Sequence, residues 1–448
     1  MYFSPEVMTV AMFGTLILFI ALGHPLAITL VSVATIFGLI DNGFNFARLF
    51  NLFTSNSWGT FNEYTLVALP LFIFMAQLLD KSKVAEKLFD VLYVNLGTIK
   101  GGLGLAVVLV CTIFAATTGI IGASVVAMGL LAAPPLINKG YQKEMASGII
   151  CSAGTLGILI PPSIMLVIYG GLTGMQATSV GNLFAAAIIP GLVLSGLYIA
   201  YISIRCQINP KLGPTISKEE AAKYSAGQKF WLTVKYMIPP LVLILLVMGT
   251  ILMGIATPTE AAGMGAAGAF ILALANRMVN WDVLQQVATN TLKTTCMVMF
   301  LFVAGKLFTQ VFISMGGGFV VSDILTGAMA PATAIFVMLL IVFILGMFID
   351  WAAILLITVP IFLPIASQLG YNPLWFAMMQ CVVLQTSFLT PPFGYALFYF
   401  IGVAPPGYTM VHIYKGIIPF ILLQILGVII LAVFPELILW LPRLAFGS

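Results

Sequence analysis

The stretch QTSFLTPPFGYALFY at residues 385–399 places two adjacent prolines inside an apolar segment that is long enough to cross a membrane. Proline has no backbone N–H, and its ring clashes with the preceding turn, which costs about 3 kcal/mol in a helix interior. A second stretch, AGTLGILIPPSIMLVIY at 153–169, has the same pattern. We therefore predict that two membrane helices are interrupted, each at a proline pair.

The composition of the chain restricts it to the membrane. Of its 448 residues, 61% are hydrophobic and only 7% are charged, whereas roughly 25% of residues are charged in soluble domains. A soluble fold cannot bury that much apolar surface. We therefore predict an all-α polytopic membrane protein that crosses the lipid bilayer several times.

Several classes of function are not indicated by the sequence. The net charge of +4 is small, and no basic run with interleaved aromatic residues points to nucleic acid. The five cysteines and two histidines lack the spacing of a metal or haem site. There is no nucleophile–base set typical of an enzyme, and no GxxxxGK[ST] pattern typical of an ATP-driven pump. We expect neither enzymatic activity nor an organic cofactor.

Lysine and arginine gather in four segments, at 81–100, 139–143, 205–235 and 277–293. Cytoplasmic loops of membrane proteins are enriched in these residues, so we place all four segments in the cytoplasm. Counting spans outward from these segments puts both chain termini on the opposite side. The longest basic segment divides the chain into halves of comparable size.

Two apolar blocks, 101–138 and 332–368, are too long for one span and have polar or glycine-rich centres. Each arm of the first block has about 16 residues, fewer than the about 20 that a full span needs. We therefore predict re-entrant hairpins, with two complete spans per block as the alternative. The basic flanks of the first block make it enter from the cytoplasm, whereas the uncharged flanks of the second make it enter from outside.

The two halves repeat one another. A Gly-Tyr pair precedes Pro161 and Pro391 by the same interval, and Tyr169 matches Tyr399. Because the charge pattern orients the halves oppositely, the repeat is predicted to be inverted, as in secondary transporters whose sites lie where helices break. The alternative is that the prolines only kink packed helices. The predicted parts are N-terminal scaffold helices at 1–64; a first repeat at 65–204, with its hairpin at 101–138 and its broken helix at 143–172; a cytoplasmic loop at 205–235; scaffold helices and an interfacial arm at 236–293; and a second repeat at 294–448, with its hairpin at 332–368 and its broken helix at 372–402.

A broken helix exposes carbonyls on one side and amides on the other. The carbonyls before Pro161 and Pro391 suit a hard cation such as sodium, and the half-helix that starts after each break presents a positive dipole end to an anion. Hydroxyls and glycines at the hairpin tips and breaks add oxygen ligands and allow close approach. The candidate binding residues in the first half are Thr117, Thr118, Gly119, Gly122, Ser124, Thr155, Gly157, Pro161 and Ser163. Those in the second half are Gly346, Asp350, Gln385, Thr386, Ser387, Thr390 and Pro391.

Asp350 is the strongest single candidate, since it is an acid at the tip of an apolar hairpin with no basic residue nearby in the sequence. Acids within membranes are costly and usually functional. The alternative is that Asp350 reaches water or caps a helix. All four arginines lie in loops or near span ends, so an anionic substrate would depend on bound cations, helix ends and hydroxyls.

The segments ATTGIIGASVVAMG, GILIPPSIMLVIYG, GIATPTEAAG, GMFIDWAAILLITVPIFLPI and LTPPFGYALF resemble the large membrane subunit of the TRAP (tripartite ATP-independent periplasmic) transporters. The resemblance covers nearly the whole chain. It implies an elevator mechanism, sodium-driven uptake, a small four-helix membrane subunit and a periplasmic substrate-binding protein. It also implies sodium sites at the first hairpin tip with Gly157–Pro161 and at the second tip with Ser387–Pro391. Many members have SGSS at the first tip, whereas this chain has TGIIGAS, so the resemblance does not specify which substrate this chain carries.

Together these observations predict a subunit that couples sodium to the uptake of a small organic acid across the bacterial inner membrane. A carrier without an ATP-binding motif needs an ion gradient, and alternating access would come from movement of the repeat pair. Two alternatives remain: a stand-alone sodium–carboxylate symporter of related fold, and a channel. A channel would require rings of charge along a pore, which the sequence lacks.

We predict that Asp350→Asn and Thr118→Ala each impair sodium-dependent uptake, because each removes an oxygen ligand at a hairpin tip. Transport would be measured with and without a sodium gradient, and folding would be checked by size-exclusion chromatography. Unchanged sodium dependence in both variants would contradict the assignment of these tips.

Overall fold

The computed structural model describes residues 4–118, 121–216, 225–327, 329–392 and 394–447, and the regular elements of these residues are all helices. Eight helices within them are long and apolar enough to cross a membrane. The predicted all-α polytopic class is therefore confirmed.

The helices fall into two consecutive series. The first series is α1 (Pro5–Ala21), α2 (Leu26–Asp41), α3 (Phe46–Phe61), η1 (Tyr64–Val67), α4 (Ala68–Lys81), α5 (Val84–Leu96), α6 (Gly102–Thr118), α7 (Ile121–Asn138), α8 (Lys143–Thr155), η2 (Leu156–Ile158), α9 (Ile164–Thr173), η3 (Gln176–Thr178) and α10 (Val180–Ile208). The second series is α12 (Ala226–Leu252), α13 (Pro258–Ala275), α14 (Trp281–Ser314), α15 (Gly317–Gly327), α16 (Pro331–Gly346), α17 (Trp351–Gln368), α18 (Pro373–Ser387), α19 (Tyr395–Ile401), α20 (Met410–Val433) and α21 (Glu436–Phe446).

Two predicted boundaries differ from these bounds. The helix α10 continues to Ile208 and α12 begins at Ala226, so the basic connection between them is shorter than the predicted loop at 205–235. Within 236–293, α14 starts at Trp281 and continues as one helix to Ser314. The charged residues of these segments lie partly within helices, because residues such as lysine, arginine and glutamine continue a helix well.

Local chemistry sets several helix starts. The Ser225 hydroxyl accepts from Gln228 N and the Gln228 side chain accepts from Ser225 N, which caps α12. Thr257 and Glu260 form the same reciprocal pair at the start of α13. Such reciprocal pairs, known as capping boxes, provide hydrogen-bond partners for backbone amides that have none inside the helix.

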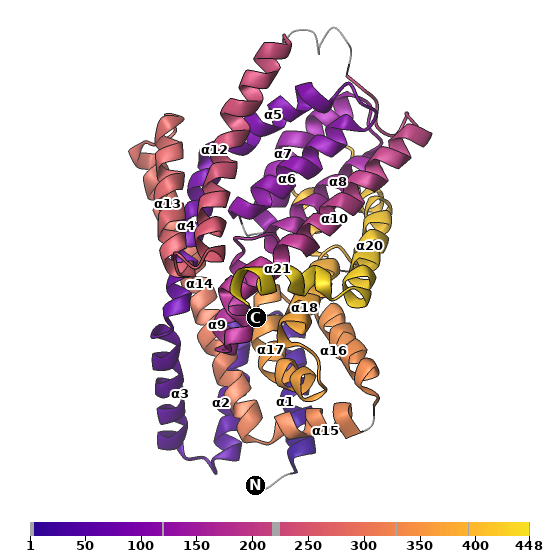
Figure 1. The fold of residues 1–448 in the computed structure, drawn as a ribbon. Helices are drawn as coiled ribbons and strands as arrows, with labels where there is room; N and C mark the ends of the chain where they lie inside the picture. Colours follow the sequence, from indigo (N-terminus) through magenta and orange to yellow (C-terminus); the bar gives the residue numbers. More distant parts are fainter. Residues whose placement is uncertain (1–3, 119–120, 217–224, 328, 393, 448) are drawn as a thin grey trace.

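The two hairpins, each with the first segment of its broken helix, lie toward opposite ends of the molecule, with α6, α7 and α8 in the upper half of Figure 1 and α16, α17 and α18 in the lower half. Each hairpin packs against the first segment of its own broken helix, α8 or α18. Its second arm also packs against the second segment of the other broken helix, since α7 contacts α19 and α17 contacts α9. The two hairpins and the two broken helices are therefore interlocked.

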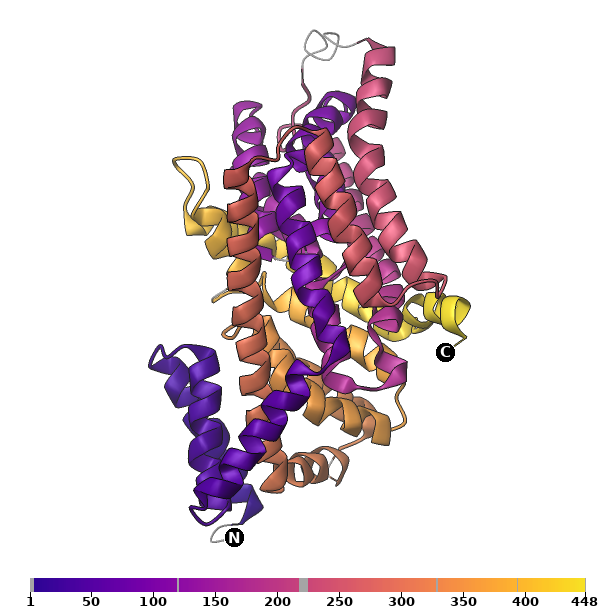
Figure 2. The same cartoon turned by 90° about the vertical axis from the view of Figure 1, so that its left-hand side faces the viewer.

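The long helices α4, α13 and α14 lie side by side on one face of the molecule, which Figure 2 shows from the front. We call these three helices the panel, and a polar contact joins the panel to the second hairpin. The carbonyl of Leu356 in α17 has no helical donor, because Pro360, four residues later, lacks an N–H. The Thr309 hydroxyl of α14 donates to it at 3.0 Å.

The basic segments meet at one end of the molecule. Gly101 N donates to Gly213 O at 2.9 Å, and Gln142 N donates to Leu212 O at 3.4 Å. The Lys87 ammonium of α5 donates to the Asn276 side chain after α13 at 3.1 Å. Segments that are far apart in the sequence, and that we placed on the same side of the membrane, thus contact one another.

Glycine allows an unusually close contact between α8 and α20. A Cβ on Gly148 would lie 2.3 Å from the carbonyl oxygen of Gly416, and a Cβ on Gly416 would lie 2.1 Å from the carbonyl oxygen of Glu144. Small residues let membrane helices approach to backbone contact, which increases their dispersion energy. This contact fixes the first broken helix against α20.

We expect Gly148→Ala to lower the melting temperature of the detergent-solubilised protein by roughly 2–12 °C, since overpacking costs about 1–3 kcal/mol and each kcal/mol corresponds to about 2–4 °C. The matched control is Gly196→Ala in α10, where no atom lies within 4 Å of the added Cβ. The control should be neutral or stabilising, because alanine favours helix. Equal melting temperatures for both variants would contradict the close contact.

Candidate functional site

The proline pairs interrupt two helices at matching places. In the first half, α8 ends at Thr155, the short turn η2 follows, and α9 begins at Ile164. In the second half, α18 ends at Ser387 and α19 begins at Tyr395. The peptide bond between the two prolines is cis in both interruptions. We call these interruptions, residues 159–163 and 388–394, the first and the second break.

Both breaks contain carbonyl oxygens without a donor. Within the described residues, no N–H or O–H group donates to the carbonyls of 159–162 in the first break or of 389–391 in the second. Buried carbonyls are normally paired, and several unpaired ones together can instead replace the water around a hard cation. The two breaks are therefore candidate cation sites.

Hydroxyl groups surround the first break. Thr155 donates to the carbonyl of Ser152 at 2.8 Å, and Ser163 donates to the carbonyl of Ile158. Both side chains are fully buried. A hydroxyl that donates its proton to a carbonyl keeps its oxygen lone pairs, so each can still act as an acceptor or a cation ligand. Gly157, which is also buried, lies in η2 and packs with it against α6.

Hydroxyl groups also lie at the second break. Ser387 donates to the carbonyl of Leu384 at 2.6 Å, and Thr390 donates to the carbonyl of Thr386 at 3.0 Å. The Thr386 hydroxyl donates to the carbonyl of Val382 at 3.0 Å, and Thr386 also lines an apolar cavity of about 800 Å³ between α16, α18 and α20.

The second hairpin tip lies against the last turn of α18. A Cβ on Gly346 would lie 1.9 Å from Ser387 Oγ and 2.6 Å from Ser387 Cβ. Only glycine fits at this position without movement of the neighbouring chain. The structure therefore brings the two candidate residues Gly346 and Ser387 together, and this contact fixes the end of α18 to the hairpin.

Asp350 follows this tip and caps α17. Its carboxylate accepts from the Ala352 amide at 3.1 Å, so the alternative that Asp350 caps a helix is realised. The carboxyl also lies close enough to Tyr395 and Tyr399 of α19 to interact with their phenol groups electrostatically. No lysine or arginine among the described residues forms an ion pair with it.

Tyr399 connects Asp350 to the first hairpin. A Cβ on Gly122, near the start of α7, would lie 3.0 Å from the ring carbon Cζ of Tyr399. The first hairpin thus packs against an aromatic ring of the second half, whose phenol group also interacts electrostatically with Asp350. Ser124 is buried two residues further along α7. The side chains of Thr117 and Thr118, and Gly119 as a whole, lie outside the described residues.

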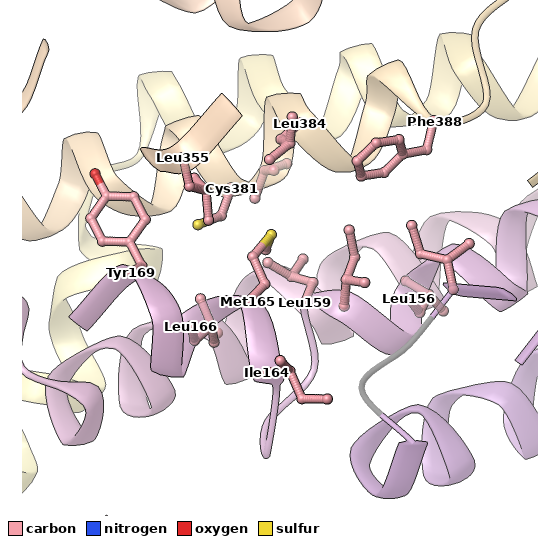
Figure 3. Packing of buried hydrophobic residues seen from close by; sticks show 14 of the residues in the cluster. Leu156, Leu159, Ile164, Met165, Leu166, Tyr169, Leu355, Cys381, Leu384 and Phe388 are labelled. Atoms are coloured by element: carbon pink, nitrogen blue, oxygen red, sulfur yellow. The ribbon is translucent and has the colours of Figure 1, made fainter. Parts of the chain in front are cut away.

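A buried polar chain that the sequence analysis missed crosses between the halves. The Tyr169 hydroxyl of α9 donates to Gln380 Oε1 of α18 at 3.0 Å, and Gln380 Nε2 donates to the Thr358 hydroxyl of α17 at 2.6 Å. Figure 3 shows Tyr169 directed toward the helix that carries Cys381, beside an otherwise apolar interface. The available signal was Gln380 itself, because an amide in an apolar span requires partners.

Gln385 lies one turn before the second break and has no such partners. Its side chain is completely buried. Neither Oε1 nor Nε2 forms a hydrogen bond within the part of the chain that is described. Among the predicted residues it is the one whose polar atoms are least accounted for by the protein.

Comparison with known proteins identifies the family of the chain. The profile described as "Tripartite ATP-independent periplasmic transporter, DctM component" matches residues 13–437. The C4-dicarboxylate TRAP transporter large permease protein DctM of Vibrio cholerae is 32% identical, with 95% of each chain covered. The ectoine/5-hydroxyectoine TRAP transporter large permease protein UehC of Ruegeria pomeroyi is 31% identical and covers 98% of this chain, with 100% of its own length aligned.

Solved structures with little sequence identity show the same fold. The Alcanivorax borkumensis YdaH transporter superposes with a TM-score of 0.67 at 14% identity, covering 94% of this chain and 98% of its own. The Neisseria gonorrhoeae efflux pump MtrF superposes with a TM-score of 0.60 at 13% identity, covering 88% of this chain and 85% of its own.

We predict that Gly346→Ala destabilises the protein and that Ser387→Gly in the same chain restores most of the loss. The alanine Cβ would overlap the Ser387 side chain, and removing that side chain relieves the overlap. Melting temperatures of the parent, both single variants and the double variant form a cycle that isolates the coupling. Strictly additive effects would contradict the contact between tip and break.

Proposed function

Because the chain belongs to the DctM component family of the tripartite ATP-independent periplasmic transporters, we propose that it is the large membrane subunit of a sodium-coupled uptake system for a small organic acid. Members of this family are transporter permease components and not enzymes. The proposal places the chain in the bacterial inner membrane. It assigns ion and substrate binding to the two breaks and the hairpin tips that contact them.

The observation that carries the sodium assignment is the pair of breaks with unpaired carbonyls at 159–162 and 389–391. Sodium is a hard cation that prefers oxygen ligands, and the adjacent hydroxyls of Ser163 and Ser387 can complete a coordination shell. Two equivalent sets of oxygens support two sodium sites, one in each half. A monovalent ion also suits neutral carbonyl ligands better than a divalent ion, which would call for more carboxylates.

The elevator mechanism is supported by the arrangement of the two halves. We propose that they form an inverted repeat, since their hairpins lie toward opposite ends of the molecule and interlock through α7 with α19 and α17 with α9. These interlocked elements would move as one body against the panel of α4, α13 and α14. The connecting helices α5 and α15 would act as arms. The Thr309–Leu356 hydrogen bond lies at the boundary between the two bodies and would have to break during the movement.

The substrate class follows from the relatives and from the charges of the site. Permeases named for C4-dicarboxylates, ectoine and sialic acid are similar along nearly the whole chain. Residues 156–164 and 385–395 contain no lysine or arginine. A carboxylate would therefore be held by bound sodium, by the N-terminal amides of α9 and α19, and by hydroxyls. We propose a small organic acid, with a small four-helix membrane subunit and a periplasmic binding protein as partners.

Reconstitution into liposomes tests this function. With the small subunit and the cognate binding protein present, we expect uptake of one radiolabelled probe among a C4-dicarboxylate, ectoine and sialic acid. Uptake should require an inward sodium gradient and should stop when potassium replaces sodium. The binding protein without its ligand serves as the control for leak.

Two results would overturn the proposal in different ways. Sodium-driven uptake by the chain alone would replace the tripartite assembly with a stand-alone symporter. Flux that continues when sodium is absent from both sides, in proportion to the substrate gradient alone, would identify a channel.

A further inference from the structure

Gln385 and Gln380 lie on the same helix, are both completely buried, and yet differ in their bonding. Gln380 uses its carbonyl oxygen to accept from Tyr169 and its amide group to donate to Thr358. Gln385 forms neither kind of bond within the described residues. A buried amide without partners opposes folding, because it loses its bonds to water and gains none. Such a group needs a partner from outside the described residues, such as a water molecule, an ion or a ligand.

The position of Gln385 places its amide between the two breaks. It follows Cys381 by four residues, so both side chains lie on one face of α18. Figure 3 shows Cys381 directed toward Met165 and Tyr169 of α9, the helix that follows the first break. Ser387, two residues later, lies on the opposite face against Gly346. Gln385 therefore faces the first broken helix from the last turn before the second break.

The two polar atoms of the Gln385 amide restrict the kinds of ligand that can bind to it. Its carbonyl oxygen can coordinate a cation, whereas its NH2 group repels a cation and requires an acceptor such as a carboxylate oxygen. The flanking carbonyls at 159–162 and 389–391 are acceptors too, so they also favour a cation. Residues 156–164 and 385–395 contain no lysine or arginine, so a bound cation would supply the positive charge that the breaks themselves lack for an anion.

We propose that Gln385 binds both transported species at once, with Oε1 as a sodium ligand and Nε2 as a donor to a carboxylate oxygen of the substrate. Each species would then position the amide for the other, so that sodium raises the affinity for substrate and substrate raises the affinity for sodium by the same factor. This assignment rests on the proposed sodium-coupled uptake and gives it a physical link between the two ligands.

Two substitutions test the roles of the Gln385 oxygen Oε1 and the nitrogen Nε2 separately. Gln385→Met keeps the shape and removes both polar atoms, whereas Gln385→Glu keeps an oxygen at Oε1 and replaces the donor with an acceptor. Gln380→Met is the matched control, because it breaks a completed hydrogen-bond chain on the same helix. All variants would be compared in the complete transporter with its two partners.

The first measurement is thermal stability without sodium and then in a sodium chloride titration, with potassium chloride at the same ionic strength as reference. Without sodium, Gln385→Met should melt at the parental temperature or above it, whereas Gln380→Met should melt lower. The sodium concentration for half-maximal stabilisation should rise at least tenfold in Gln385→Met and stay within about twofold of the parent in Gln385→Glu.

The second measurement is uptake of the transported probe identified above. The KM for the probe should rise at least tenfold in both Gln385 variants. Sodium should lower the KM for the probe in the parent and should no longer do so in either variant. Parental sodium and probe constants in Gln385→Met would overturn the assignment and make Gln385 a structural residue only. If Gln385→Met does not fold, Gln385→Glu decides alone: a parental KM and parental sodium coupling would refute the donor role.

Failure of this inference differs from failure of the proposed function. If uptake by the parental protein does not respond to sodium, the sodium coupling itself is wrong. If the parent responds to sodium and both Gln385 variants respond equally, only the role of Gln385 is wrong.

Discussion

Every backbone carbonyl in the apolar interior of this protein needs a donor, and the two proline pairs remove donors at two places. In α17 the protein solves the same problem directly, since the Thr309 hydroxyl replaces the N–H that Pro360 lacks. At the two breaks the described residues provide no such replacement. Pro360 therefore leaves no unpaired carbonyl, whereas the two proline pairs leave carbonyls that can bind a ligand. The proposed transport chemistry depends on these carbonyls.

The rest of the fold keeps the breaks in place. Glycine brings α8 into backbone contact with α20, and Gly346 brings the second hairpin tip onto Ser387. The chain from Tyr169 through Gln380 to Thr358 ties the first broken helix to the second and to its hairpin. Because a site with few charged groups has weak long-range attraction for its ligands, its affinity depends on how rigidly these oxygens are held.

Much of the site could be predicted from local chemistry, and the limits of that prediction are physical. The breaks, the hydroxyls beside them and Asp350 could be found because proline and acidic residues in apolar segments are costly wherever they occur. Thr386 looked equivalent to Ser387, yet the helical rotation between neighbours turns it into an apolar cavity. Gln380 was missed because its role depends on Tyr169, which is 211 residues away in the chain.

The sequence alone determined that the chain is an all-α membrane protein, that it contains two matching interruptions, and which residue types surround them. These properties follow from composition and from backbone chemistry within a few residues. Only the tertiary structure decided that Gly122 packs against the Tyr399 ring, and that Gln380 is paired while Gln385 has no partner among the described residues. Such pairings depend on the packing of helices from different halves, and no local energy in the sequence specifies which faces meet.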